Sequence, residues 1–245
     1  MRTAAFAFPA LLVLLQISTV TKMSDRALDG LKGPAKHVFE ESSPLSNGSS
    51  VAGDARCRRG TWIYDPQGRL TSKSDYPGIH CEEEIKEDYT YDKDGNRHEV
   101  HDASRASGIS LGPGPPTARR DFVHKRTFDS DQEGRKIVSD YTYSSVGTLV
   151  DLSIHVYDTQ NRLLESRSLD MQKRVTGRKT FSYLDNARFP TGSTSFGQDA
   201  KPYSRATYAD YELNAQGDWI KRTEITERQG GSKSKRFLYR TIDYY

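Results

Sequence analysis

Residues 149–163 read LVDLSIHVYDTQNRL, and this stretch predicts a strand, a tight turn and the start of a second strand. Two sets of residues alternate in it: Val150, Leu152, Ile154 and Val156 on one side, and Asp151, Ser153, His155 and Tyr157 on the other. A period of two places the sets on opposite faces of a strand, so we expect one buried face and one solvent-facing face. Asp158 and Asn161 then supply the chemistry of a turn.

The turn after this strand recurs along the chain. Tyr-Asp, two further residues, Gly or Asn and then a basic or polar residue occur at 64–70, 91–97 and 157–163, with variant copies at 128–135 and 211–219. The Asp can accept backbone N–H bonds across the turn, and Gly or Asn tolerates the positive φ of a tight hairpin. Repeated hairpins rich in Tyr, Thr, Val and Ile predict an all-β fold, an antiparallel meander of about ten to twelve strands whose twisted sheet curls toward a barrel or a sandwich.

The turn motif resembles that of the YD-repeat family, also called RHS-like repeats, and the likeness covers roughly Trp62 to Tyr245. Members of that family build long β shells that enclose toxin cargo or decorate cell surfaces, and some are linked to carbohydrate or partner binding. The chain carries few, irregular copies and shows no cargo domain at its C-terminus, so it looks like a small stand-alone exported bacterial member. The resemblance implies a repeat architecture more than it implies an activity.

Composition predicts three segments. Residues 1–23 combine an early Arg with an apolar run, which is typical of a signal peptide, and residues 24–59 lack any period, which is typical of a disordered linker. Residues 60–245 are expected to form the YD-repeat-like β domain, with an exposed Pro/Gly-rich loop at 103–117. We therefore expect a secreted or periplasmic protein with no stable membrane span after signal cleavage.

Charge and motifs argue against several classes of partner. The chain has 36 Lys and Arg against 33 Asp and Glu in 245 residues, a formal net charge of +3, and its basic clusters are short. Nucleic-acid binders carry a basic face or stripe, so no nucleic-acid partner is expected. No cofactor is expected either, because the sequence contains no phosphate loop and no dinucleotide fingerprint.

The two cysteines, Cys57 and Cys81, are candidates for a disulfide, because thiols oxidise outside the cytosol and the count is even. The alternative is a metal site that uses His80 and Cys81 with His98 or His101. That spacing matches none of the paired Cys/His patterns that specify zinc. We favour solvent-facing histidines and expect no metal.

Three patterns raise the question of catalysis. Gly108–Gly112 fits the nucleophile elbow around Ser110, but three prolines follow where the elbow needs a helix. The acidic run 82–84 and the histidine pair at 98–101 are better explained by a solvated acidic stretch and by a strand, respectively. We expect no enzyme. The alternatives are an envelope enzyme that acts on glycan and an immunity-like partner of an exported toxin.

Binding is the function that composition favours. The 14 Tyr, 9 Phe and 2 Trp exceed what the turns require, and aromatic rings on a solvent-facing sheet can stack on sugars or contact a protein. The positions favoured for such binding are Tyr143, Tyr157, Tyr183, Tyr211 and Trp219. The alternative is that these rings only pack within the sheet. Residues 236–245 are expected to form an open edge that accepts a partner strand. The sequence thus predicts a non-enzymatic binding or structural module with a carbohydrate or protein ligand.

Overall fold

The computed structural model describes residues 22–44, 56–76, 84–101 and 120–245, which form one short helix, α1 (Asp25–Leu28), and fourteen strands. The strands are β1 (Ala35–Pro44), β2 (Cys57–Tyr64), β3 (Leu70–Asp75), β4 (Ile85–Tyr91), β5 (Arg97–His101), β6 (Arg120–Ser130), β7 (Lys136–Tyr143), β8 (Leu149–Tyr157), β9 (Leu163–Leu169), β10 (Val175–Ser182), β11 (Gly192–Phe196), β12 (Pro202–Leu213), β13 (Trp219–Arg228) and β14 (Lys233–Tyr244). Consecutive strands pair antiparallel, which confirms the predicted all-β meander.

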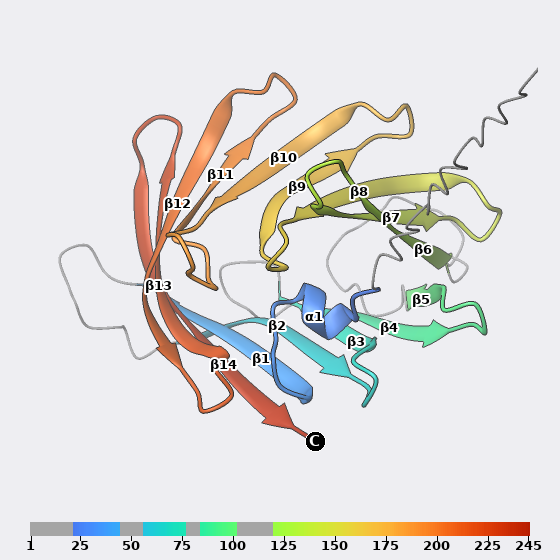
Figure 1. The fold of residues 1–245 in the computed structure, drawn as a ribbon, viewed down its shortest axis with the longest axis horizontal. Helices are drawn as coiled ribbons and strands as arrows, with labels where there is room; N and C mark the ends of the chain where they lie inside the picture. The colour runs from blue at the N-terminus through green and yellow to red at the C-terminus, as the bar shows by residue number, and fades with distance from the viewer. Residues whose placement is uncertain (1–21, 45–55, 77–83, 102–119) are drawn as a thin grey trace, which may run out of the picture.

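The sheet closes on itself (Figure 1). β1 lies between β2 and β14, so that Val38 is opposite Trp62 on one side and opposite Ile242 on the other. Closure gives the backbone N–H and C=O groups of each strand partners on both sides, which is how antiparallel proteins remove their exposed edges. The predicted open edge at residues 236–245 is therefore wrong, because β14 pairs with both β13 and β1.

The predicted disorder over 24–59 is wrong for residues 24–44, which contain α1 and β1. Ser24 caps the helix, because its hydroxyl accepts the Ala27 N–H at 3.2 Å. β1 shows no apolar alternation, since Val38 is followed at the next same-face position by Glu40. β1 pairs with β14, which lies at the other end of the chain. The alternation of neighbouring residues does not predict pairing between such distant strands.

Other predicted segments lie outside the described residues. These are the signal peptide, apart from Lys22 and Met23, and the Pro/Gly-rich loop at 103–117, which includes Ser110. The described helix has four residues, and no helix in the described ranges is long and apolar enough to cross a membrane.

The recurring turn has one backbone geometry. In the first copy, the Asp65 N–H donates to the Arg69 carbonyl at 2.9 Å, and the Gly68 N–H donates to the Asp65 carbonyl at 2.8 Å. The Asp65 carboxylate accepts the Arg69 N–H at 2.9 Å. Gly68 has a φ of 81°, a conformation that glycine adopts without steric cost. The same backbone pairing recurs in the turns that begin at Asp92, Asp131, Ser144, Asp158, Asp170, Gly197, Asn214 and Arg228.

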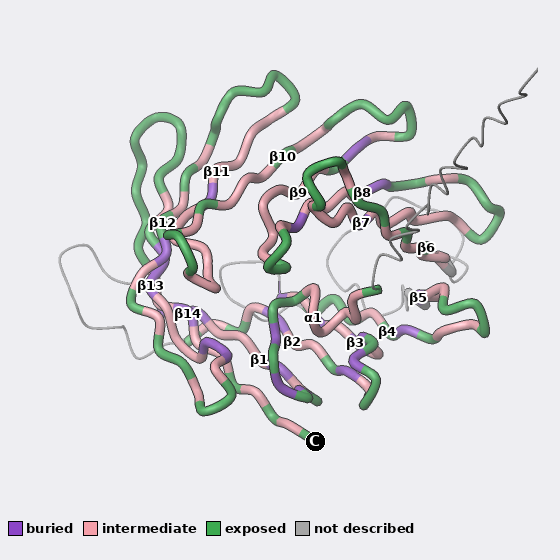
Figure 2. Tube along the Cα trace, in the orientation of Figure 1, coloured by how far each residue is buried: buried purple, intermediate pink, exposed green. Residues whose placement is uncertain are grey.

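A buried cluster joins the N-terminal segment to the first barrel strands, β1 to β4; buried residues also occur on other strands of the barrel (Figure 2). It consists of Leu31, Ala35, Val38, Tyr64, Leu70 and Tyr89. On β8, the predicted alternation is present, but the polar side faces inward: His155 lies 3.9 Å from Asp140, which points toward α1. On the opposite, apolar side, Val150 is 45% exposed and Leu152 is 4% exposed. A barrel of this strand number is too wide for its own side chains to fill, so its inner face accommodates polar side chains.

Candidate binding site at the strapped mouth

The first described residues cross one mouth of the barrel, and we call residues 22–34 the strap (Figure 1). The Arg26 N–H donates to the Gly68 carbonyl at 3.0 Å, which joins the strap to the β2–β3 turn. At the other end, the Lys32 N–H donates to the Asp218 carboxylate at 2.8 Å, in the β12–β13 turn. The strap therefore connects turns from the two halves of the chain.

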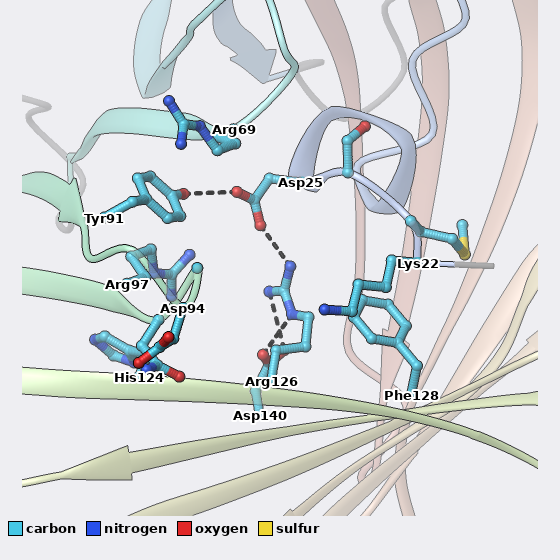
Figure 3. A pocket seen from close by; sticks show the side chains of 14 residues that line it. Lys22, Asp25, Arg69, Tyr91, Asp94, Arg97, His124, Arg126, Phe128 and Asp140 are labelled. Atoms are coloured by element: carbon cyan, nitrogen blue, oxygen red, sulfur yellow. Dashed lines mark hydrogen bonds and ion pairs between the residues drawn. The ribbon is translucent and has the colours of Figure 1, made fainter. Parts of the chain in front are cut away.

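Asp25, in α1, is the principal polar anchor of the strap (Figure 3). Its carboxylate accepts hydrogen bonds from the Leu70 N–H at 2.9 Å and from the Tyr91 hydroxyl at 2.7 Å. It also pairs with Arg126 Nη1 at 2.5 Å. Burial alone would raise the pKa of Asp25, but the Arg126 charge and the hydrogen-bond donors outweigh burial and lower that pKa. Asp25 is therefore an ionised anchor at neutral pH.

Arg126 links the strap to the barrel wall. Its Nε and Nη2 donate to the Asp140 carboxylate at 2.6 and 3.1 Å, across the neighbouring strands β6 and β7. Burial opposes the charge of Arg126, but the carboxylates of Asp140 and Asp25 outweigh burial and raise its pKa. Beside Asp140, burial lowers the pKa of His155 and favours the neutral imidazole. Asp25, Arg126 and Asp140 thus form a continuous chain of opposite charges.

Asp29, at the C-terminal end of α1, is a buried carboxyl group of a different kind. It accepts the Tyr64 hydroxyl at 2.5 Å. Burial raises the pKa of Asp29, and the nearby Asp25 charge adds to that rise. The neutral form of Asp29 is therefore favoured relative to an exposed aspartate.

Asp218 holds the far end of the strap. Besides the Lys32 N–H, its carboxylate accepts the Tyr244 hydroxyl at 2.8 Å and Arg188 Nη2 at 3.0 Å. Burial would raise the pKa of Asp218, but these donors outweigh burial and lower that pKa. Hydrogen bonds from three separate parts of the chain therefore converge on this one ionised carboxylate.

A pocket of about 230 Å³ opens beside Asp25, between the strap, the β4–β5 turn and strands β6 and β7 (Figure 3). Its lining includes the Tyr91 and Phe128 rings and the cationic side chains of Arg69, Arg97 and Arg126. Aromatic faces beside a few fixed polar groups are the usual composition of a small-molecule site.

Arg97, the first residue of β5, has hydrogen-bonding capacity that the described residues do not use. Its guanidinium lies 4.5 Å from the centroid of the Tyr89 ring. Its buried Nε has no hydrogen-bond partner within the described ranges. A buried donor without a partner costs about 1–3 kcal/mol, so an acceptor oxygen placed in the pocket would relieve that cost.

A network of hydroxyl, imidazole and carboxylate groups joins β5, β6 and β7. Glu99 pairs with His124 Nε2, and the Thr142 hydroxyl lies 3.0 Å from His124 Nδ1. With Nε2 protonated toward the carboxylate, Nδ1 accepts the hydroxyl proton, as in a nucleophile site. Acyl transfer also needs donors aimed at the developing oxyanion, whereas the backbone N–H groups of β6 serve the strand pairing on both sides. The network therefore fixes the His124 ring as part of the pocket lining.

The five aromatic residues predicted to bind a ligand do not share one surface. Tyr157 and Trp219 are each 4% exposed. The guanidinium groups of Arg240 and Arg222 lie 3.9 and 4.4 Å from the Trp219 ring centroid. Burial raises the pKa of Tyr157. Both residues pack inside the fold in this structure.

The other three predicted residues are partly buried. The Tyr183 and Tyr211 hydroxyls donate to backbone carbonyls at 3.0 and 2.7 Å, and burial raises the pKa of Tyr183 to about 12. Tyr143 stacks on Tyr141 with ring centroids 6.4 Å apart, at the end of the barrel opposite the strap. None of the five lines the pocket beside the strap. A ligand role for them remains a prediction.

The residues that build the pocket carry only weak signals in the sequence. Asp25 follows Ser24, a pairing typical of a helix N-terminus, and this is the one local sign that the strap is structured. Arg97 and Arg126 stand among other polar strand residues, and nothing in their neighbourhood marks them. Their importance depends on which strands meet at the mouth.

Cys57, the first residue of β2, is disulfide-bonded. Cys81 lies outside the described residues, as does His80, so the Cys57–Cys81 pairing remains a prediction. Within the described ranges, no group of three or more His, Cys, Asp or Glu side chains is placed to hold a metal ion. His98 lies instead 3.3 Å from the Asp92 carboxylate, beside a turn.

No protein-family model matches the sequence, and no curated protein matches it. Among solved structures, the chain is similar to a porin-like protein from Bacteroides vulgatus, with 11% identity and a TM-score of 0.39, covering 86% of this chain and 98% of that one. A porin-like protein from Bacteroides uniformis has 12% identity and a TM-score of 0.29, covering 86% and 99%. A DUF1329 family protein from Desulfovibrio piger has 9% identity and a TM-score of 0.26, covering 89% of each. Similarities this weak carry no argument about function.

Proposed function

We propose that the chain is a non-enzymatic exported binding module whose mouth pocket holds a small saccharide. The observation that carries the proposal is the pocket lining, in which the Tyr91 and Phe128 side chains stand beside the unpartnered Nε of Arg97. Sugars offer C–H faces that pack on aromatic rings and hydroxyls that pair with fixed polar groups. The pocket of about 230 Å³ is smaller than drug-sized sites of about 300–1,000 Å³, so we propose a single sugar ring or a chain end.

The geometry of the carboxylates favours binding over hydrolysis. Glycoside hydrolysis needs two carboxyl groups that flank the scissile bond, about 5–9.5 Å apart, with one free to donate a proton. In this pocket, Asp25 and Asp140 both pair with Arg126, and the Arg126 charge helps to lower the pKa of Asp25. A protein that only holds its saccharide is consistent with that arrangement.

The proposal includes the compartment and the family. The apolar run Ala4–Leu15 after an early Arg supports export to the cell envelope or beyond it. Nine turns share one backbone pairing, and the five of them that begin with Asp support kinship with YD-repeat proteins. In a closed barrel such turns present their loops at the two mouths, where a ligand enters.

The test is binding of the processed, exported protein to a glycan array, followed by calorimetric titration of the best saccharide. Arg97→Gln is expected to weaken binding about tenfold, since it removes a cationic side chain from the pocket lining. Arg178→Gln is the matched control, because Arg178 lies 4.5 Å from the Phe196 ring centroid in the same kind of contact, away from the pocket lining. The proposal fails if folded protein binds no glycan, or if Arg97→Gln binds as well as the control variant.

A protein ligand is the second candidate, and an apolar patch on the outer face of β7 and β8 favours it. The stacked Tyr141 and Tyr143 rings lie near Val150, which is 45% exposed, and near Val146, which is 84% exposed. Contiguous exposed apolar side chains often mark interaction sites. If a protein from envelope extracts cross-links to the unchanged chain, Tyr143→Glu should abolish that cross-linked product. The same variant should leave saccharide binding unchanged. A cross-linked partner that persists in the variant would exclude this surface.

A further inference from the structure

Four arginines gather on the inner face of the barrel on β2, β14 and β13, the strands on either side of β1, and we call them the arginine wall: Arg59, Arg222, Arg236 and Arg240. Two of them stand directly opposite glutamates in the strand register. Arg240 is opposite Glu40 of β1, and Arg236 is opposite Glu224 of β13. Arg240 also acts electrostatically on Asp29 in the strap, which places the wall on the inner side of the sheet.

The wall has more positive than negative charge. Arg236 donates to Glu224 Oε1 through Nε at 2.8 Å and through Nη2 at 2.5 Å, and Arg240 Nε donates to Glu40 at 3.0 Å. Arg59 donates instead to the Ser42 hydroxyl at 2.7 Å. Within the described residues, neither Arg59 nor Arg222 forms an ion pair with a carboxylate. Four guanidinium groups and two carboxylates leave two positive charges uncompensated.

Electrostatics at Arg59 agree with that excess. Burial lowers the pKa of Arg59, and the neighbouring Arg236 charge lowers it further. Glu40 and Glu224 oppose this shift without cancelling it. Arg59 therefore lies near the paired Arg236. Arg222 lies near the paired Arg240, since both flank the Trp219 ring.

Aromatic rings hold part of the wall in place. Trp219, which is 4% exposed, has Arg240 at 3.9 Å and Arg222 at 4.4 Å from its ring centroid. Arg222 also lies 4.6 Å from the Tyr208 ring centroid. Its buried Nε has no hydrogen-bond partner in the described part of the chain. The Tyr211 hydroxyl hydrogen-bonds the Arg222 side chain and helps to fix it. A guanidinium that is held in place by rings and a hydroxyl is preorganised for an incoming oxyanion.

We propose that the arginine wall is a second binding site, separate from the mouth pocket, that takes the phosphate group of a phosphomonoester. A phosphomonoester carries a charge of about −1.5 to −2 at pH 7, which matches the excess of the wall. Its oxygens also match the planar fork of donors that arginine presents. The phosphate can belong to a soluble phosphorylated compound or to a lipid headgroup, and both offer the same group to the wall.

The experiment is calorimetric titration of the processed, exported protein with two phosphate probes and a comparison for each. Glucose 6-phosphate represents a soluble source, phosphatidylcholine vesicles that contain phosphatidic acid represent a lipid source, and glucose and pure phosphatidylcholine vesicles are the uncharged comparisons. Arg59→Gln and Arg222→Gln remove arginines that have no ion pair, so no buried carboxylate is left unpaired. Each is expected to weaken phosphate binding about tenfold, the effect of losing one charge-assisted contact.

Arg58→Gln is the matched control. Arg58 neighbours Arg59, but its guanidinium lies 4.9 Å from the Phe39 ring centroid and donates to the Tyr76 hydroxyl at 3.1 Å. This variant should bind phosphate like the unchanged protein, and thermal unfolding should show that all three variants are folded. Arg97→Gln should also leave phosphate binding unchanged, which separates this site from the saccharide pocket.

The outcomes are distinct. If glucose 6-phosphate binds and vesicles with phosphatidic acid do not, the result supports a site for a soluble phosphorylated compound. If only the vesicles with phosphatidic acid bind, the result supports a site for a lipid headgroup. The proposal is overturned if neither phosphate probe binds folded protein better than its uncharged comparison. It is also overturned if Arg58→Gln loses as much affinity as Arg59→Gln and Arg222→Gln.

Discussion

Replacing Asp218 by Asn tests how the strap is held across the mouth. The Asp218 carboxylate is 1% exposed and accepts the Lys32 N–H at 2.8 Å, the Tyr244 hydroxyl at 2.8 Å and Arg188 Nη2 at 3.0 Å. Asparagine keeps one acceptor oxygen and replaces the other by an NH₂ group. That NH₂ group is a donor and would face the N–H and O–H donors that surround Asp218, so it could not replace the lost hydrogen bonds. Arg188 would also lose its counter-charge in the variant.

The expected magnitude follows from those contacts. A hydrogen bond to a charged group contributes about 1.5–3 kcal/mol, and breaking a buried ion pair costs about 3–5 kcal/mol. Because these contacts share one carboxylate, their losses overlap rather than add. We expect Asp218→Asn to lower the free energy of unfolding by about 3–5 kcal/mol at pH 7, which corresponds to a fall in Tm of roughly 10 °C.

The assay is urea unfolding followed by circular dichroism, at pH 7 and at pH 3. The donors around Asp218 lower its pKa in the folded protein. The stabilisation is therefore present above the unfolded pKa of about 3.9 and is lost as the pH falls through the folded pKa. Since Asn cannot titrate, the difference between the two proteins should shrink below about pH 4.

Asp243→Asn is the control for this experiment. Asp243 is on β14, next to Tyr244, and its carboxylate lies 3.3 Å from His37 with its side chain 63% exposed. An exposed pair contributes little, so this variant should change the free energy of unfolding by less than about 0.5 kcal/mol. The reasoning is refuted if Asp218→Asn costs less than about 1 kcal/mol at pH 7, or if its cost is the same at both pH values.

Three further predictions concern the strap and the turns. Burial raises the pKa of Asp29, so the stability that this group contributes is present at low pH and is lost as the pH rises through the folded pKa. In thermal unfolding, Asp29→Asn should therefore be more stable than the unchanged protein at pH 8 and should lose that advantage at pH 4. Arg126→Met leaves two carboxylates without their counter-charge, so it should lower the free energy of unfolding in urea by about 3–5 kcal/mol. The control Arg135→Met, in a more exposed turn pair, should lower it by less than about 1 kcal/mol. Lys173 has a φ of 61°, so Lys173→Gly should raise the free energy of unfolding by up to about 1 kcal/mol; a loss of stability would show that the strain argument fails there.

The turns and strands were largely predictable from sequence because their determinants are local. Within the repeated turn, the Asp65 carboxylate reaches the N–H of Arg69, four positions along, and Gly68 supplies the positive φ between them. The alternation in β8 likewise needed only residues two positions apart. Hydrogen bonds and side-chain directions of this range are set by nearest neighbours, so the all-β meander follows from the sequence alone.

The assignment of faces was harder to predict. The alternation in β8 leads one to expect polar residues such as His155 to face solvent, whereas His155 faces the barrel interior, beside Asp140. A wide closed barrel has a polar inner face, and alternation alone cannot say which side of a strand is inside. Trp219 illustrates the same difficulty, because its aromatic ring is buried against two arginines rather than presented to a ligand.

The chain's own sequence thus determined its turns, its strand alternation and its antiparallel order, since each depends on residues a few positions apart. Only the tertiary structure decided that β1 closes the barrel against β14, a pairing in which Glu40 meets Arg240. The same holds for the site, where Asp25 meets Arg126 only because the strap crosses the mouth. Contacts between such distant residues depend on how the whole sheet curves and closes, and no local pattern encodes that geometry.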